Sequence, residues 1–160
     1  MTTHDDELAA LISAVAASAT DEAQDGQSAT SLHRCDVLMV DDTGASRELL
    51  AAILRNFAGR LVLREVRNGN EAMKQWHELN PRITLLDIDM PGEDGLAVLQ
   101  TMRRERADPF VAMISASSSM DNVKRAMALG ASGFVIKPYK PQRILDLLQK
   151  YTAQSGHAFS

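Results

Sequence analysis

The stretch VLMVDD, residues 37–42, decides the fold, because four apolar residues run directly into two aspartates, Asp41 and Asp42. A short apolar run of this kind is typical of a strand that is buried on both faces of a parallel sheet. Three later segments repeat the pattern of an apolar run that ends in a polar residue. These are residues 83–86 before Asp87, residues 110–114 before Ser115 and residues 134–136 before Lys137.

Helical patterns alternate with these strands, which predicts five βα units from Val37 onward. A further strand is expected over residues 61–66, and the expected helices span residues 46–57, 71–79, 96–105, 121–129 and 142–151. Repeated βα units of this length imply an α/β fold, with a doubly wound five-stranded parallel sheet, right-handed crossovers and helices on both faces. The first helix is expected to bury a stripe of Leu49, Leu50, Ile53, Leu54 and Phe57.

The carboxyl ends of parallel strands lie at one edge of the sheet, where open α/β folds place their sites. That edge would gather the carboxylates of Asp41, Asp42 and Asp87, the hydroxyl of Ser115 and the ammonium of Lys137. Two carboxylates about 4 Å apart repel each other by roughly 4 kcal/mol at an effective dielectric constant of about 20, so the cluster requires a cation. Hard oxygen ligands select Mg²⁺ or Mn²⁺.

The same residues suit phosphoryl chemistry, since carboxylates such as Asp87 form acyl-phosphates in enzymes. Attack on phosphorus builds charge that a metal, Lys137 and Ser115 would neutralise or hydrogen-bond. Each residue also has a plainer interpretation: Asp42 as a helix N-cap, Ser115 as a turn residue and Lys137 as a solvated surface charge. Their coincidence at matching strand ends favours the functional interpretation.

Composition excludes some classes of function. The 160 residues are 45% hydrophobic, which suffices for one domain with a core, and 17 basic against 21 acidic residues do not suggest a nucleic-acid binder. The single cysteine, Cys35, precedes an apolar strand, allows no internal disulfide and is expected to be a small core residue. We therefore expect a reducing compartment and a cytoplasmic protein.

The apolar stretch of residues 8–19 resembles the core of a signal peptide, but His4, Asp5, Asp6 and Glu7 precede it without any Lys or Arg. A secretory signal has a basic start, so we expect no export. No other stretch is long enough to span a membrane, and no membrane partner is expected.

The chain is expected to have three parts: an arm over residues 1–35, one domain over residues 36–152 and a flexible tail over residues 153–160. In the arm, Leu8, Leu11, Ile12 and Val15 have the spacing of an amphipathic helix, and residues 20–31 have the composition of a polar linker. A frayed helix on a disordered arm is the plainer interpretation, because a lone helix of this length is marginal in water. A docking or dimerisation helix is the alternative.

Four motifs carry a resemblance to a known family. They are VLMVDDTGASRELL from residue 37, LLDIDMPGEDG from residue 85, AMISASS from residue 112 and GASGFVIKPY from residue 130. Together they resemble the receiver domain of two-component response regulators, in particular a stand-alone, chemotaxis-regulator-like receiver. The resemblance covers residues 37–151 and implies the flavodoxin-like strand order 2-1-3-4-5.

The resemblance implies a role for each residue of the site. Asp87 would be the phospho-acceptor, with Ser115 hydrogen-bonding the phosphoryl group and Lys137 pairing with it. Asp42 would bind Mg²⁺ directly and Asp41 largely through water. Asp87 and the backbone carbonyl of Asp89 would complete the protein ligands of the metal.

The resemblance also implies a switch made by Ser115, Phe134 and Pro138, with a cis peptide between Lys137 and Pro138. When Ser115 moves toward the phosphate, the ring of Phe134 would turn inward and remodel the face made by the fourth helix, fifth strand and fifth helix. This face would bind the downstream protein target. Whether the protein also forms a homodimer is a question that the sequence leaves open. The basic residues of this face favour an acidic partner, unless they are simply solvated: Lys124, Arg125, Lys140, Arg143 and Lys150.

The function implied is a phosphorylation-dependent signalling switch that takes its phosphoryl group from a histidine kinase or a histidine phosphotransfer protein. It would signal by protein contact, without a DNA-binding output domain, and would catalyse only its own phosphoryl transfer and dephosphorylation. One alternative is an aspartate-dependent phosphohydrolase of the haloacid-dehalogenase type, which the sequence from Asp87 to Asp89 also resembles. That class needs a further acidic motif downstream, where the chain has only Asp146 after Lys137. The other alternative is a receiver scaffold that works without phosphate.

Overall fold

A computed structural model describes residues 32–57, 59–117 and 119–156. The predicted amphipathic helix, the polar linker and the last residues of the predicted tail lie outside these residues. The division of the chain at residues 35 and 152 therefore stays a prediction.

The centre of the molecule is a five-stranded parallel sheet, and the predicted strand order is confirmed. Its strands lie in the order β2-β1-β3-β6-β7, which is 2-1-3-4-5 when only the strands of this sheet are counted. All four neighbouring pairs are parallel. The strands are β1 (Val37–Val40), β2 (Leu63–Val66), β3 (Ile83–Asp87), β6 (Val111–Ser115) and β7 (Gly133–Ile136).

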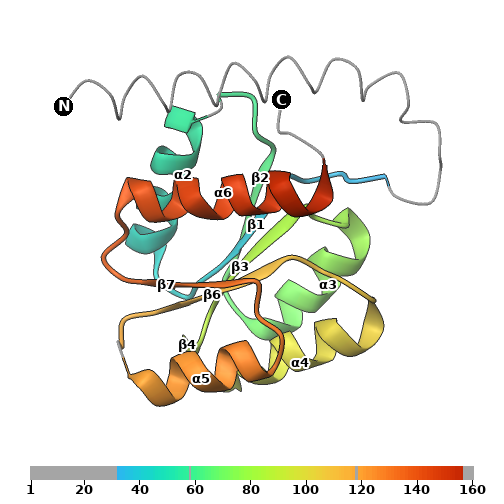
Figure 1. Ribbon diagram of the computed structural model, residues 1–160, viewed down its shortest axis with the longest axis vertical. Helices are drawn as coiled ribbons and strands as arrows, with labels where there is room; N and C mark the ends of the chain where they lie inside the picture. Colours follow the sequence, from blue (N-terminus) through green and yellow to red (C-terminus); the bar gives the residue numbers. More distant parts are fainter. Residues whose placement is uncertain (1–31, 58, 118, 157–160) are drawn as a thin grey trace.

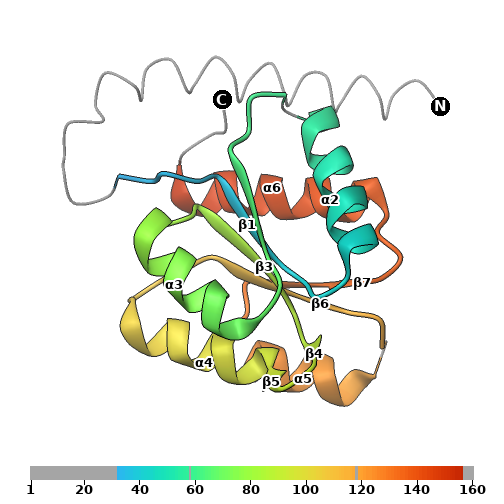
Figure 2. The same ribbon diagram turned by 180° about the vertical axis from the view of Figure 1, so that it is seen from behind.

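Among the described residues, five helices cover the two faces of the sheet, and Figures 1 and 2 show this arrangement from opposite sides. Helices α2 and α6 lie on one face, and α3, α4 and α5 lie on the other. Their bounds are α2 (Gly44–Phe57), α3 (Gly69–Leu79), α4 (Gly95–Glu105), α5 (Met120–Ala128) and α6 (Pro141–Ser155). None of the helices in the described part of the chain is both long and apolar enough to cross a membrane.

Each face of the sheet has its own apolar core, because both faces of a doubly wound sheet are covered by helices. The strands β1, β3 and β6 are buried along their whole length. Cys35 is buried as predicted, and burial raises the pKa of its thiol to about 12.

The predicted stripe of α2 is wrong at one position. Leu49 is 46% exposed, whereas Leu50, Ile53, Leu54 and Phe57 are buried. One helix face has room for only part of a dense apolar run, and Leu49 lies outside the face that the sheet covers.

A small antiparallel ribbon between β3 and α4 was not predicted. It pairs β4 (Asp89–Met90) with β5 (Glu93–Asp94) through a turn in which Gly92 has φ 80°. Strands of two residues are too short to produce a periodic pattern. The side chain of Asp94 then caps α4 by accepting a hydrogen bond of 3.0 Å from the backbone N–H of Leu96.

Helix α4 begins directly against the end of β3, and a glycine makes this close approach possible. A Cβ atom on Gly95 would lie well inside van der Waals distance of the carbonyl oxygen of Asp87 and 2.8 Å from the Cα of Ile88. The absence of a side chain at this position lets α4 pack against the backbone that carries Asp87.

Candidate functional site

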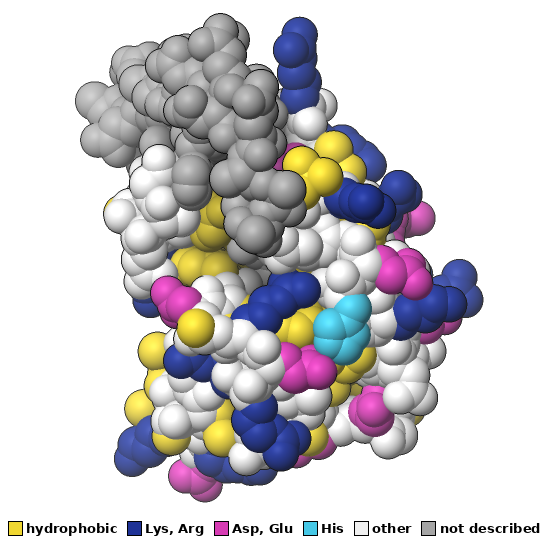
Figure 3. Space-filling view, turned by 90° about the vertical axis from the view of Figure 1, so that its right-hand side faces the viewer, with side chains coloured by type: hydrophobic (Ala, Val, Ile, Leu, Met, Phe, Trp, Pro, Cys, Tyr) yellow, Lys and Arg dark blue, Asp and Glu magenta, His cyan; other side chains and the backbone are white. Residues whose placement is uncertain are grey.

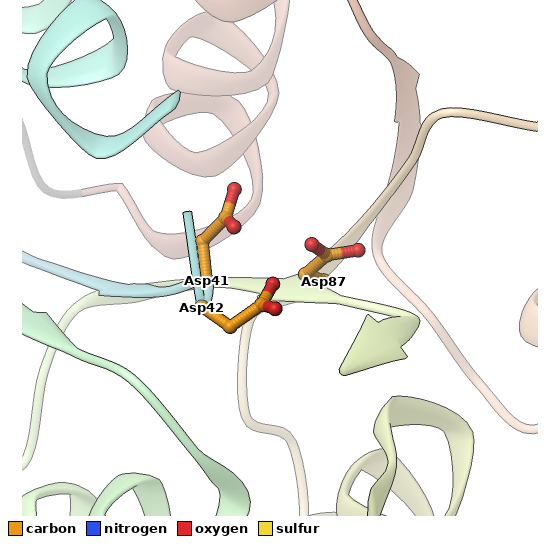
Figure 4. Close-up of side chains that lie close together, drawn as sticks. All are labelled: Asp41, Asp42 and Asp87. Carbon is orange, nitrogen blue, oxygen red and sulfur yellow. The ribbon is translucent and has the colours of Figure 1, made fainter. Parts of the chain in front are cut away.

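Three carboxylates lie together at the carboxyl edge of the sheet, as the sequence predicts. Asp41 and Asp42 follow β1, and Asp87 is the last residue of β3. One oxygen of each carboxylate lies within 4.8 Å of the others. Figure 4 shows the carboxylates of Asp41 and Asp42 reaching toward the space beside Asp87. Asp41 and Asp87 are each only 2% exposed, whereas Asp42 is exposed.

Backbone hydrogen bonds hold the two buried carboxylates in place. The N–H of Thr43 donates to Oδ1 of Asp41 at 2.8 Å, and the N–H of Asp89 donates to Oδ1 of Asp87 at 2.9 Å. In each case the donor lies two residues after the aspartate, so the turn that follows each strand sets the orientation of its carboxylate.

Lys137 pairs with both buried carboxylates. Its Nζ lies 2.8 Å from Oδ2 of Asp41 and 3.1 Å from Oδ2 of Asp87. Burial alone would lower the pKa of Lys137, but its hydrogen bonds to Asp41 and Asp87 outweigh burial, so the pKa is raised. For Asp87, burial is the dominant effect, and it raises the pKa of the carboxyl despite the nearby N–H and ammonium donors.

Ser115 ends β6 and is fully buried. Its hydroxyl donates a hydrogen bond of 2.9 Å to Oδ2 of Asp89 and accepts one of 3.0 Å from the N–H of Ser117. The structure therefore brings Ser115 to the predicted edge of the sheet, with its proton directed to Asp89.

Lys137 follows β7, and the expected cis peptide between Lys137 and Pro138 is confirmed. The backbone N–H of Lys137 donates to the carbonyl of Ser115 at 2.9 Å, which joins the ends of β6 and β7. Phe134 lies on β7 and packs, half-buried, against the core under α3, α4 and α5.

Two neighbours of the site were not predicted from the sequence. The hydroxyl of Tyr139 lies 3.5 Å from Oδ2 of Asp41, and burial together with the charges of Asp41 and Asp87 raises the pKa of Tyr139. The guanidinium of Arg47 donates to the carbonyl oxygen of Asp41 and pairs with Glu65 at 3.1 Å. In the sequence, the only feature that pointed to Tyr139 was its position directly after Lys137 and Pro138. No feature of the sequence pointed to Arg47.

The donor set fits a hard divalent cation. The side chains of Asp41, Asp42 and Asp87 offer only carboxylate oxygens as ligands. Asp42 is exposed, and the other two are buried. Oxygen-only ligand sets suit Mg²⁺ or Mn²⁺, and Mg²⁺ keeps several of its waters, which an exposed Asp42 allows. The predicted contribution of the Asp89 carbonyl stays a prediction.

Charges on the face of the molecule that carries α3 and α4 are mixed. Figure 3 shows the face that carries α3 and α4, where Lys and Arg side chains are interspersed with Asp and Glu side chains. On this face the basic side chains do not join into one patch.

The family model of the response regulator receiver domain matches residues 37–149, which include every residue of the site. The chain belongs to the response regulator receiver family. Members of this family are signalling switches, and their acidic residues bind Mg²⁺.

Individual relatives agree with this assignment. The receiver is 33% identical over 114 residues to the chemotaxis protein CheY of Thermotoga maritima. This match covers 71% of this chain and 94% of that protein. It is 30% identical over 115 residues to the probable C4-dicarboxylate response regulator DctR of Bacillus subtilis, covering 72% of this chain but only 51% of DctR.

A solved structure of a CheY-like receiver domain protein from Methanospirillum hungatei superposes with a TM-score of 0.69 at 21% identity. The match covers 76% of this chain and 97% of that one, and it supports the fold.

Asp146 does not join the site. It lies exposed on α6, where its carboxylate accepts a hydrogen bond of 2.8 Å from Gln142. A phosphohydrolase of the haloacid-dehalogenase type requires a downstream acid at its site. Asp146, the one acidic residue after Lys137, does not provide it.

Proposed function

We propose that this receiver accepts a phosphoryl group on Asp87 from a histidine kinase or a histidine phosphotransfer protein, with Mg²⁺ as the cofactor. The observation that carries the proposal is the setting of the Asp87 carboxylate. It is buried at the end of β3, lies 3.1 Å from Nζ of Lys137 and shares the sheet edge with Asp41 and Asp42.

In the proposed reaction, Oδ of Asp87 attacks the phosphorus of a phosphohistidine. A new O–P bond forms, the P–N bond breaks, and the histidine of the donor leaves with the bonding electrons and takes up a proton. Lys137 and the hydroxyl of Ser115 stabilise the negative charge of the phosphoryl oxygens. Asp41, Asp42, Asp87 and the backbone carbonyl of Asp89 would hold Mg²⁺, which supplies further charge neutralisation when bound.

The proposed output surface is the face of α5, β7 and α6, the fourth helix, fifth strand and fifth helix of the receiver. A cavity of about 370 Å³ lies at this face, lined by Phe134, Ile136, Pro138, Lys140 and Arg143 among others. We propose that Ser115 and Phe134 change this face when Asp87 is phosphorylated, and that an acidic protein partner binds it.

Two of the five basic residues on this side have partners within the receiver. Arg125 lies 3.9 Å from Asp94, and Nζ of Lys150 donates to the carbonyl of Ser132. Lys140 and Arg143, which line the cavity, are the better candidates for contacts with a partner.

Reversing both charges, with Lys140→Glu and Arg143→Glu, is therefore expected to weaken capture of the phosphorylation-dependent partner by about tenfold or more, since like charges across an interface are strongly unfavourable. The measurement is a quantitative pull-down with and without phosphorylation. Lys74→Glu on α3 is the control for charge reversal away from this face, and equal capture by all variants would contradict the proposed surface.

Four expectations stay predictions: a cytoplasmic location, the absence of a DNA-binding output, the formation of a homodimer and the role of residues 1–35. Deleting residues 1–35 tests the last of these by comparing phosphorylation rate and oligomeric state with those of the full chain.

The phospho-acceptor role is tested by the intact mass of the protein after incubation with acetyl phosphate. We expect a phosphoryl adduct in the presence of Mg²⁺ and none when the metal is chelated, because the clustered carboxylates need a cation before an anionic donor can approach. An adduct that forms equally well with chelator would contradict the metal role. No adduct with either acetyl phosphate or a panel of histidine phosphotransfer proteins would contradict the proposed function.

A further inference from the structure

Asp89 contacts the site in two ways. Its backbone N–H donates to Oδ1 of Asp87 at 2.9 Å, and its carboxylate accepts the hydrogen bond of Ser115 at 2.9 Å. The antiparallel ribbon holds this backbone, because Asp89 pairs with Asp94, which itself caps α4. Asp89 therefore connects the proposed phospho-acceptor to the residue that would contact the phosphoryl group.

The hydroxyl of Ser115 has one proton, and that proton is committed to Asp89. Ser115 also accepts a hydrogen bond from Ser117, so its geometry is set from both sides, and the hydroxyl is fully buried. A hydrogen bond to an ionised carboxylate is roughly twice as strong as one between neutral groups. To donate to a phosphoryl group on Asp87, Ser115 must give up its bond to Asp89.

We propose that Asp89 is a positioning residue that holds Ser115 in the unphosphorylated arrangement and thereby lowers the affinity of the site for a phosphoryl group. The proposal rests on the phospho-acceptor role of Asp87. Its physical basis is competition between two acceptors, the Asp89 carboxylate and the phosphoryl oxygens, for a single proton. A ligand shifts such an equilibrium only by its differential affinity for the two states, so part of the phosphoryl binding energy is used to break the Ser115–Asp89 bond.

The competition has a signature that distinguishes it from charge repulsion. Asp89 also carries a negative charge near the site, and its removal would favour any anion whether or not Ser115 has a hydroxyl. If Asp89 acts through Ser115, the effect of removing its carboxylate depends on the Ser115 hydroxyl. If it acts through charge alone, the two substitutions have additive effects.

The test is a double-mutant cycle with beryllofluoride and Mg²⁺ as the phosphoryl mimic, measured by titration calorimetry. We expect Asp89→Ala to raise the affinity about tenfold when Ser115 is present and at most about twofold when it is combined with Ser115→Ala. Asp89→Asn, which keeps a neutral acceptor, should lie between wild type and Asp89→Ala. The combination of Asp89→Ala with Ser115→Thr, which keeps the hydroxyl, should restore most of the tenfold effect.

Asp94→Asn is the matched control, because it removes one negative charge from the same ribbon while an asparagine still caps α4. We expect it to change the affinity less than about twofold. Equal effects of Asp89→Ala with and without the Ser115 hydroxyl would overturn the proposed competition while leaving the phospho-acceptor role intact. Failure of the wild-type protein to bind beryllofluoride would instead overturn the phospho-acceptor role and this inference with it.

Discussion

Replacing Asp87 by asparagine is expected to abolish the phosphoryl adduct completely and, at the same time, to stabilise the metal-free protein. An amide is not a nucleophile for phosphorus, so the introduced asparagine cannot accept the phosphoryl group. The geometry should survive, because the side chain of the introduced asparagine can still accept the N–H of Asp89 and Lys137 keeps its 2.8 Å contact with Asp41.

The gain in stability follows from burial. Burial raises the pKa of Asp87, so the folded state binds the proton more tightly than the unfolded state does. The favourable contribution of Asp87 is then complete below the ordinary aspartate pKa of about 3.9 and is lost as the pH rises through the raised pKa of the folded state. At neutral pH the ionised carboxylate costs stability, and a neutral amide of the same shape removes that cost.

Three measurements check this prediction. Intact mass after acetyl phosphate reports the adduct, and urea denaturation at pH 7 and pH 4 without metal reports the stability, with a smaller gain expected at pH 4. Mg²⁺ affinity should fall by about tenfold or more, since even the loss of an outer-shell partner of a metal ligand costs roughly 10- to 100-fold. Asp146→Asn, at an exposed acid on α6, is the control. An adduct on the variant would show that another residue accepts the phosphoryl group.

Replacing Lys137 by methionine is expected to destabilise the metal-free protein by about 2–3 kcal/mol at pH 7. The change removes the ammonium that lies 2.8 Å from Asp41 and 3.1 Å from Asp87, and it leaves both buried carboxylates without that counter-charge. Breaking a buried pair costs about 3–5 kcal/mol, and the expected loss is smaller because the Lys137 side chain is partly solvated.

The loss should depend on metal and on pH in a defined direction. Saturating Mg²⁺ should recover much of the lost stability, because the cation supplies positive charge to the same carboxylates. Acidification should also reduce the difference from wild type, since protonating one aspartate ends the repulsion; the deficit appears as the pH rises above the ordinary aspartate pKa of about 3.9. Lys124→Met on the exposed side of α5 is the control, and a deficit that neither Mg²⁺ nor acid reduces would contradict this account.

The fold was largely predictable from local patterns. The run of residues 37–40 and the run before Ser115 are apolar throughout, and the run before Asp87 is apolar except for Thr84. This is the pattern typical of a strand buried on both faces, and all three are strands. Helix ends were predicted less well. Helix α6 continues to Ser155, four residues beyond its predicted end, because polar residues of its last turn give no periodic signal, and it ends where Gly156 adopts φ 73°.

The sequence by itself determined that Asp41, Asp42, Asp87, Ser115 and Lys137 meet at the site, because each lies at or just after the carboxyl end of a strand and parallel strands end at one edge. Only the tertiary structure decided which atoms bond. Lys137 bridges Asp41 and Asp87, Ser115 donates to Asp89, and the hydroxyl of Tyr139 donates to Asp41. These contacts join residues that lie 26 to 98 positions apart. They depend on strand order, register and side-chain rotamers, which are set when the whole sheet packs, whereas apolar periodicity reports only the environment of each element on its own.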